Sequence, residues 1–147
     1  MNRPFEILLV EDSVTDAKLT VRVLKKHGLA DKLKWVKNGA DAMDFILARG
    51  AYASRNPSRL PKLILLDIAL PMIDGLQVLE NLKLRPHLSI ISVVVMTASK
   101  VETDRLKSEK LGVNAYLEKP VDEGNFIRVV KEIELYGYFF GSGSAAC

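Results

Sequence analysis

Cysteine is almost absent from this chain, because its single cysteine, Cys147, is the last of 147 residues. One cysteine cannot form a disulfide within the chain, so a disulfide framework is excluded and a reducing compartment is expected. No apolar run approaches the roughly 18 residues of a membrane span, and no basic region followed by an apolar core opens the chain. We therefore expect a cytoplasmic protein without a membrane partner.

The chain also lacks a strong excess of charge of one sign. It has 21 Lys and Arg against 18 Asp and Glu, a formal net charge of +3. The basic residues form no block and no row interleaved with aromatics, so nucleic acid is not an expected partner. The length predicts one domain with a full core. We assign residues 1–140 to this domain, with its core at about 5–136, and interpret 141–147 as a linker or cloning remnant.

The most informative stretch is the apolar run 63–66, which ends on Asp67. Four consecutive aliphatic residues are too short for a helix and do not alternate, which predicts a central strand buried on both faces. Pro71 and Asp74-Gly75 then predict a turn. A carboxylate at the carboxyl end of such a strand lies where open α/β sheets bind ligands, although an Asp there can also be a turn former or helix cap.

Strand and helix patterns alternate five times along the chain. The predicted strands lie at 5–10, around 33–35, and at 63–67, 90–96 and 113–117, and each precedes apolar positions at helical spacing. Five βα units with short links predict one doubly wound α/β domain, flavodoxin-like (βα)5, in which helices cover both faces of a five-stranded parallel sheet.

Caps and breakers place the ends of the predicted helices. Ser13 and Asp122 are predicted N-caps of the first and last helices, and Ser99 with Glu102 predicts a capping box for a helix through Leu111. The predicted stops are glycines at 28, 50 and 112. The segment 51–61, rich in Pro, Ser and Asn, predicts a loop without a further element.

Because parallel strands end at one edge of their sheet, five side chains are expected to meet there: Glu11, Asp12, Asp67, Thr97 and Lys119. Three carboxylates repel one another unless a cation joins them, and Mg²⁺ with water completing an octahedron is the usual one. An anionic tetrahedral group beside Asp67 would then have metal, ammonium and hydroxyl aimed at its oxygens. The pattern predicts a phosphoryl acceptor site.

The order of these residues resembles the receiver domain of two-component response regulators. The resemblance covers about residues 5–136 and rests on Glu11-Asp12, Asp67 followed by Pro71 and Gly75, Thr97-Ala98, and Lys119-Pro120. It implies a signalling domain, not an enzyme, whose Asp67 takes a phosphoryl group from a histidine kinase or phosphotransfer protein. The signal would leave through a protein surface switched by phosphorylation.

The resemblance also implies roles for the neighbours of the acceptor. Mg²⁺ would be ligated by Asp12, Asp67 and the backbone carbonyl of Ala69, with Glu11 supporting it through water. The phosphoryl oxygens would be held by Thr97, Ala98 and Lys119, and the Lys119-Pro120 peptide would be cis.

Three further positions have implied roles in switching and timing. Tyr116 matches the aromatic whose ring turns inward when Thr97 moves toward the phosphoryl group, although it could simply pack at the sheet edge. Ala69 and Ser99 occupy positions that tune hydrolysis of the phosphoaspartate. Because Ala69 cannot orient an attacking water, we expect a lifetime that is not among the shortest.

The loop 51–61 and the aromatics at 136–140 resemble, more narrowly, the small single-domain regulators that partner cyanobacterial and other bacterial phytochromes. These four rings, Tyr136, Tyr138, Phe139 and Phe140, either contact a partner or a second copy in a homodimer, or fold back on the domain. His27 and His87 are expected to be solvated surface residues, and Trp35 to pack on an outer strand.

Three other functions fit parts of the pattern. A receiver-like module that only docks partners would not need the complete set of acids, threonine and lysine. A phosphohydrolase of the haloacid dehalogenase type would need a second Asp where this chain has Ala69. A flavodoxin-like FMN protein would need a phosphate-binding loop after the first strand, where Asp12 and Asp16 would repel a phosphate.

Overall fold

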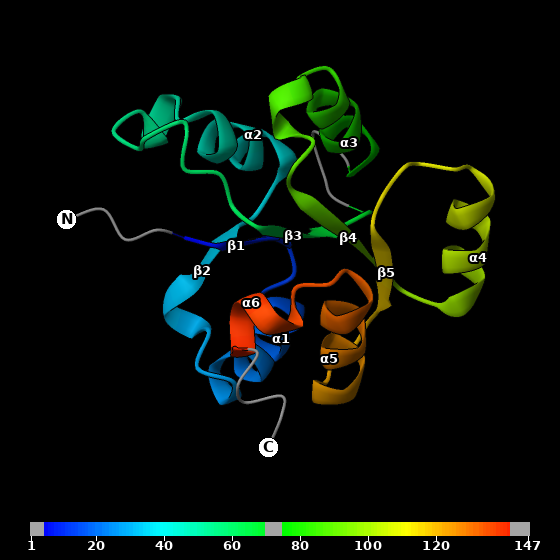
Figure 1. Ribbon diagram of the computed structural model, residues 1–147. Coiled ribbons are helices and arrows are strands. Elements are labelled where there is room, and N and C mark those ends of the chain that lie inside the picture. The colour runs from blue at the N-terminus through cyan, green and yellow to red at the C-terminus, as the bar shows by residue number, and fades with distance from the viewer. Residues whose placement is uncertain (1–4, 70–74, 142–147) are drawn as a thin grey trace.

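The computed structural model describes residues 5–69 and 75–141. The predicted turn residues Pro71 and Asp74, and the predicted linker after Gly141, lie outside the described residues. Figure 1 shows a central sheet with helices above and below it. Among the described residues, no helix has the length and apolar character needed to cross a bilayer.

The sheet consists of parallel strands in the order β2-β1-β3-β4-β5. Every residue of β1 and β3 is buried, as expected of aliphatic strands covered on both faces. This topology confirms the predicted doubly wound, flavodoxin-like fold. The strands are β1 (Ile7–Val10), β2 (Leu33–Val36), β3 (Leu63–Asp67), β4 (Ser92–Thr97) and β5 (Ala115–Glu118).

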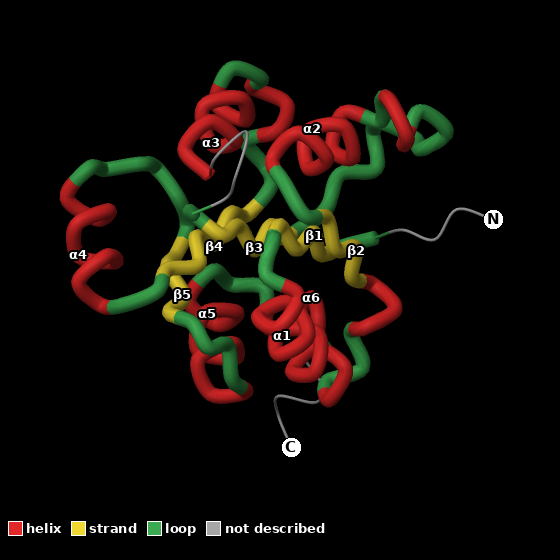
Figure 2. The backbone as a smooth tube through the Cα atoms, turned by 180° about the vertical axis from the view of Figure 1, so that it is seen from behind, coloured by secondary structure: helices red, strands yellow, loops and turns green. Residues whose placement is uncertain are grey.

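Helices cover both faces of the sheet (Figure 2). One face packs against α2, α3 and, through Leu106, α4, and the other packs against α1, α5 and α6. The α-helices are α1 (Val14–Lys26), α2 (Gly39–Leu47), α3 (Gly75–Lys83), α4 (Lys100–Ser108), α5 (Glu123–Glu132) and α6 (Tyr136–Phe140). The described residues also form short 3₁₀ helices, which are η1 (Ala30–Lys32), η2 (Gly50–Tyr52) and η3 (Pro86–Leu88).

Two of the predicted helix caps are confirmed. The Ser13 side chain accepts a hydrogen bond from the Asp16 N–H, and Asp122 forms a capping box with Asn125. The predicted capping box of α4 is wrong in one of its two hydrogen bonds, the one that Glu102 would accept from the Ser99 N–H. Ser99 caps the helix, but the Glu102 carboxylate accepts from the Ala98 N–H at 2.9 Å, one residue beyond the cap.

Two helices end earlier than their glycine stops predict. The backbone of Ala48 takes φ +54° just after α2, and that of Lys110 takes φ +50° shortly after α4. Because a left-handed residue cannot continue a right-handed helix, α2 ends three residues before Gly50 and α4 ends four before Gly112.

The segment predicted as a plain loop is partly ordered by side chains. It begins within η2, where the ring of Tyr52 packs edge-on against that of Phe45. The guanidinium of Arg55 lies 3.8 Å from the centroid of the Phe45 ring and donates to the carbonyls of Phe45 and Arg59. A cation over an aromatic face adds to these hydrogen bonds, so Arg55 fastens the segment to α2.

The aromatic tail folds back on the domain as helix α6, which the sequence did not predict as a helix. Phe139 is buried, and the Tyr138 hydroxyl donates to Glu6 Oε1 at 2.5 Å. The ring of Phe140 lies 5.4 Å from that of His27. Of the two alternatives for the tail, folding back is therefore the one observed, and a homodimer stays a prediction.

The expectation of a solvated surface residue is wrong for His27. Its side chain is only 18% exposed, and its ring centroid lies 6.5 Å from that of Phe126 and 5.4 Å from that of Phe140. The tail helix covers this position, which no local pattern around residue 27 could indicate. His87 is exposed in η3 as expected, and Trp35 packs on the edge strand β2.

Candidate functional site

The carboxyl ends of four neighbouring strands bring the predicted site residues together. Glu11 and Asp12 follow β1, Asp67 ends β3, Thr97 ends β4, and Lys119 follows β5. Ligand oxygens of Glu11, Asp12 and Asp67 all lie within 4.8 Å of one another. Glu11 and Asp67 are buried and Asp12 is exposed, so the cluster opens to solvent on one side.

The ammonium group of Lys119 forms ion pairs with three carboxylates of this cluster. Its Nζ lies 2.8 Å from Glu11 Oε1, 2.9 Å from Asp67 Oδ2 and 3.2 Å from Asp16 Oδ2. Sequence reasoning missed Asp16 as a member of the site. Acids are common in the first turn of a helix because they interact favourably with its dipole, so nothing local distinguished Asp16.

The charges in the cluster shift the pKa values of its members in opposite directions. Burial, aided by a hydrogen bond with Asp67 and opposed by Lys119, raises the pKa of Glu11 to about 7. Burial also raises the pKa of Asp67, but hydrogen bonds from Glu11, Lys119 and the Ala69 N–H outweigh it and leave this pKa below its usual value. Asp67 is therefore ionised at neutral pH, as a nucleophile must be.

The pKa of Lys119 moves the other way from what burial alone would do. Burial lowers it, but the hydrogen bonds and charges of Glu11 and Asp67 outweigh burial and raise it. Lys119 thus stays charged and provides a fixed positive group beside the acceptor.

The donor set suits a hard divalent cation. All three acids offer oxygen ligands, and buried Glu11 Oε1 has no aligned hydrogen-bond donor among the described residues, although it is ion-paired with Lys119. Oxygen ligands with an open, solvated side are what Mg²⁺ takes in proteins. Asp12 and Asp67 fit as direct ligands, whereas a role for the Ala69 carbonyl stays a prediction.

The two donors expected to hold phosphoryl oxygens, Thr97 at the end of β4 and Ala98 just after it, both form hydrogen bonds with other partners. Thr97 is fully buried, and its hydroxyl lies 2.7 Å from that of Thr103 on α4. The Ala98 N–H donates to Glu102, also on α4. Ser99 accepts from the Glu102 N–H as the helix cap. The structure therefore places these donors near the site but turned toward the first turn of α4.

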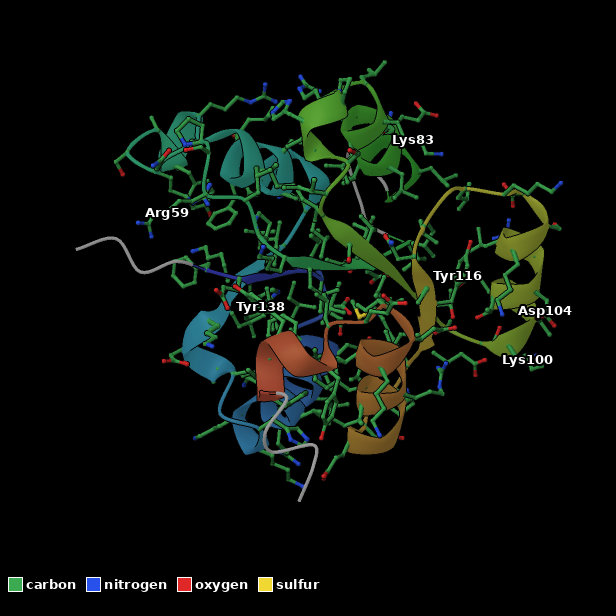
Figure 3. The ribbon with its side chains drawn as sticks, in the orientation of Figure 1. Arg59, Lys83, Lys100, Asp104, Tyr116 and Tyr138 are labelled. Atoms are coloured by element: carbon green, nitrogen blue, oxygen red, sulfur yellow. The ribbon has the colours of Figure 1, made fainter. Side chains whose placement is uncertain are left out.

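Tyr116 lies on β5 and faces α4 (Figure 3). Its side chain is half-buried, its hydroxyl is 3.5 Å from the Leu106 carbonyl oxygen, and the Lys107 ammonium lies 5.9 Å from its ring centroid. Burial, with a smaller contribution from Glu109, raises the pKa of Tyr116. These contacts show packing against α4, and the predicted switching role stays a prediction.

The backbone around the acceptor is tightly fitted. A Cβ on Gly75, at the start of α3, would lie 2.8 Å from the Ile68 Cα and 3.0 Å from the Asp67 carbonyl oxygen. Only glycine allows this approach without displacing the end of β3. The Lys119-Pro120 peptide is cis, as the resemblance implied.

An acidic cluster with one lysine at the strand ends of a (βα)5 sheet is the arrangement of a response regulator receiver domain. The chain matches that family over residues 7–131 and belongs to it.

Its relatives are response regulators, and two of the similar solved structures are those of phytochrome response regulators. Response regulator Rcp1 of Synechocystis sp. is 41% identical over 135 residues, which cover 92% of this chain and 90% of Rcp1. The Mn²⁺-bound structure of Rcp1 gives a TM-score of 0.67 at 35% identity, covering 92% of this chain and 94% of that one.

Two further solved structures extend this similarity. The bacteriophytochrome response regulator AtBRR gives a TM-score of 0.82 at 38% identity, over 90% of this chain and 94% of that one. The phosphorylated cyanobacterial phytochrome response regulator RcpA gives a TM-score of 0.69 at 36% identity, over 88% of this chain and 91% of that one. The narrower resemblance to phytochrome regulators is therefore confirmed.

Proposed function

We propose that this chain is a single-domain response regulator that accepts a phosphoryl group on Asp67 from a histidine kinase, in a reaction that depends on Mg²⁺. The observation that carries the proposal is the position of the Asp67 carboxylate, held 2.9 Å from the Lys119 ammonium inside the acidic cluster. Family membership and the phosphorylated state of the relative RcpA support it.

The transfer is a displacement at phosphorus. A carboxylate oxygen of Asp67 forms the new P–O bond, the P–N bond of the phosphohistidine breaks, and the imidazole leaves with the bonding electron pair and takes up a proton. Lys119 would hold a phosphoryl oxygen, and Asp12 and Asp67 would hold the cation. When bound, Mg²⁺ supplies the positive charge that offsets the charge gathered on the phosphoryl group and the acids.

The relatives support a proposal for the partner class. Because the chain is similar to phytochrome response regulators over nearly its whole length, we infer that the donor is a phytochrome histidine kinase or a phosphotransfer protein served by one. The chain acts as a signalling domain in the cytoplasm, and its output is a protein surface changed by phosphorylation. A homodimer is a further part of this proposal.

An intact-mass measurement after incubation with acetyl phosphate and Mg²⁺ tests the proposal. The native chain is expected to gain one phosphoryl group, and a chelator abolishes the gain. Asp67→Asn is expected to gain none, whereas Asp104→Asn, which changes an exposed acid on α4, behaves like the native chain. Equal labelling of the native and Asp67→Asn chains would reject Asp67 as the acceptor. If the native chain is not labelled and also does not bind beryllofluoride, a module that only docks partners is favoured.

A further inference from the structure

The first turn of α4 holds two hydrogen-bond donors that the phosphorylated site would need. We propose that Glu102 and Thr103 are positioning residues, which hold the Ala98 N–H and the Thr97 hydroxyl in the unphosphorylated arrangement and compete with the phosphoryl group for them. This inference rests on the proposed function, because the competition matters only if a phosphoryl group forms on Asp67.

The direction of the Thr97–Thr103 hydrogen bond follows from counting protons. The Thr103 hydroxyl donates to the Ser99 carbonyl at 3.1 Å. Because a hydroxyl has one proton, a Thr103 hydroxyl that donates to Ser99 can only accept in its 2.7 Å contact with Thr97, and on this ground we assign Thr97 as the donor. The single proton of Thr97 is therefore already committed to α4.

Burial shields the hydrogen bond between Thr97 and Thr103 from competition by water. Thr97 is 0% exposed and Thr103 is 6% exposed, so water does not readily replace either partner. A buried hydroxyl left without a partner is costly, so Thr97 leaves Thr103 only when another acceptor takes its proton. A phosphoryl oxygen on Asp67, at the end of the neighbouring strand, is such an acceptor.

The second donor is held by a charged group. The Ala98 N–H points to Glu102 Oε1 at 2.9 Å, and the other oxygen of Glu102 lies 4.0 Å from Arg105. A phosphoryl oxygen that binds this N–H must displace a carboxylate, and the two anions repel each other. Phosphorylation therefore releases both contacts of the first turn of α4.

Release at this turn reaches the surface next to Tyr116. Thr103 and Tyr116 both line a cavity of about 370 Å³ between α4, β5 and α5. Tyr116 also approaches α4 at Leu106, one turn beyond Thr103. Figure 3 shows Tyr116 on β5 across from Lys100 and Asp104 on α4. Loosening the first turn thus changes the packing that faces the Tyr116 ring.

The proposal predicts a gain of affinity on removing either contact. An affinity limited by the population of a binding-competent state rises when the competing state is weakened. The loss of one hydrogen bond from that competing state corresponds to an increase of about two- to tenfold. A residue that only stabilised the fold would not produce tighter binding.

The test is a titration of the full chain with beryllofluoride in excess Mg²⁺, since beryllofluoride mimics the phosphoryl group. Trp35, the single tryptophan, donates to the Glu11 carbonyl at 2.7 Å, so its fluorescence reports on the site. Thr103→Val is expected to bind about two- to tenfold more tightly than the native chain, and Thr103→Ser, which restores the hydroxyl, as the native chain does.

Glu102 gives a second, independent pair of variants. Glu102→Ala removes the acceptor and is expected to tighten binding, whereas Glu102→Gln keeps an acceptor oxygen without charge and is expected to lie between Ala and native. Asp104→Ala removes the same charge from the same helix turn without touching either donor and is the control for charge alone.

The outcomes separate the two proposals. Native binding with unchanged or weaker affinity in Thr103→Val and Glu102→Ala overturns the positioning role and leaves the proposed function standing. Equal tightening by Glu102→Ala and Asp104→Ala overturns the hydrogen-bond argument for Glu102. A native chain that neither binds beryllofluoride nor accepts a phosphoryl group overturns the proposed function and this inference with it.

Discussion

Replacing Lys119 by methionine removes the cation from the centre of the acidic cluster at nearly constant volume. In the native chain its ammonium lies within 3.2 Å of three carboxylates, and its side chain is 18% exposed. The variant leaves Glu11 and Asp67 facing each other without a positive partner. We expect a large loss of stability that depends on pH.

The magnitude follows from burial. Removing one partner of a buried ion pair costs about 3–5 kcal/mol because the other charge stays buried. Asp16, whose side chain is 37% exposed, adds little, since an exposed pair is worth at most about 1 kcal/mol. The expected cost of Lys119→Met at pH 8.5 is therefore about 3–5 kcal/mol, nearly all of it from Glu11 and Asp67.

The sign of the pH dependence comes from Glu11. Its folded pKa of about 7 lies above the ordinary 4.5, so its contribution to stability is fully present below pH 4.5 and is lost as pH rises through 7. Lys119 lowers this pKa in the native chain, so the variant loses more stability than the native chain over that range. Near pH 5 the protonated Glu11 relieves the repulsion, and the expected cost falls to about 2 kcal/mol, the worth of the lost charged hydrogen bond to Asp67.

Urea unfolding at pH 5 and pH 8.5, with chelator and with Mg²⁺, measures these differences. Mg²⁺ at pH 8.5 is expected to stabilise Lys119→Met more than the native chain, because the more negative cluster binds the cation more tightly. Lys100→Met, which removes an exposed lysine from α4, is the control and should change the free energy of unfolding by under about 0.5 kcal/mol. A cost for Lys119→Met that is the same at both pH values would refute the reasoning.

Three further variants probe the frame around the site. A hydrogen bond with Glu6 raises the pKa of Tyr138 to about 12. This contact therefore contributes stability that is fully present below pH 10 and is lost as pH rises through 12. An absorbance titration of Glu6→Gln should show one tyrosine ionising nearer pH 10. Gly75→Ala should cost about 1–3 kcal/mol in urea unfolding and slow labelling by acetyl phosphate, because its methyl group presses on the end of β3. Asn114→Ala should cost about 1 kcal/mol, since it removes the acceptor of the Val93 N–H, and unchanged unfolding would mean that water replaces it.

The sheet could be predicted from the sequence because its signals are local. The run 63–66 has no alternation and ends on an acid, and such a run is stable only as a strand covered on both faces. Ser13 and Asp122 act within three residues of themselves, so their caps are also visible in the sequence. The ends of α2 and α4 were less predictable, because the left-handed residues there are Ala48 and Lys110.

Contacts that cross the fold had no such local signal. Arg55 stacks on Phe45, ten residues earlier, and the tail helix covers His27 from the other end of the chain. Asp16 meets Lys119 across 103 residues. Each of these depends on which surfaces the fold leaves uncovered, and that is set by all elements together.

In the site, too, some features could be predicted from the sequence and others could not. Parallel topology fixes where the strand ends lie, so the positions of Asp67, Thr97 and Lys119 follow once the strands are assigned. Topology does not decide which of several acceptors within reach takes a given proton. In this structure the Thr97 hydroxyl is hydrogen-bonded to Thr103. Only a few hydrogen bonds decide this arrangement, so a ligand that offers a hydrogen bond of comparable strength can reverse it. The positioning role that we propose for Thr103 depends on this balance, because a donor bound too firmly to α4 could not be released to a phosphoryl oxygen.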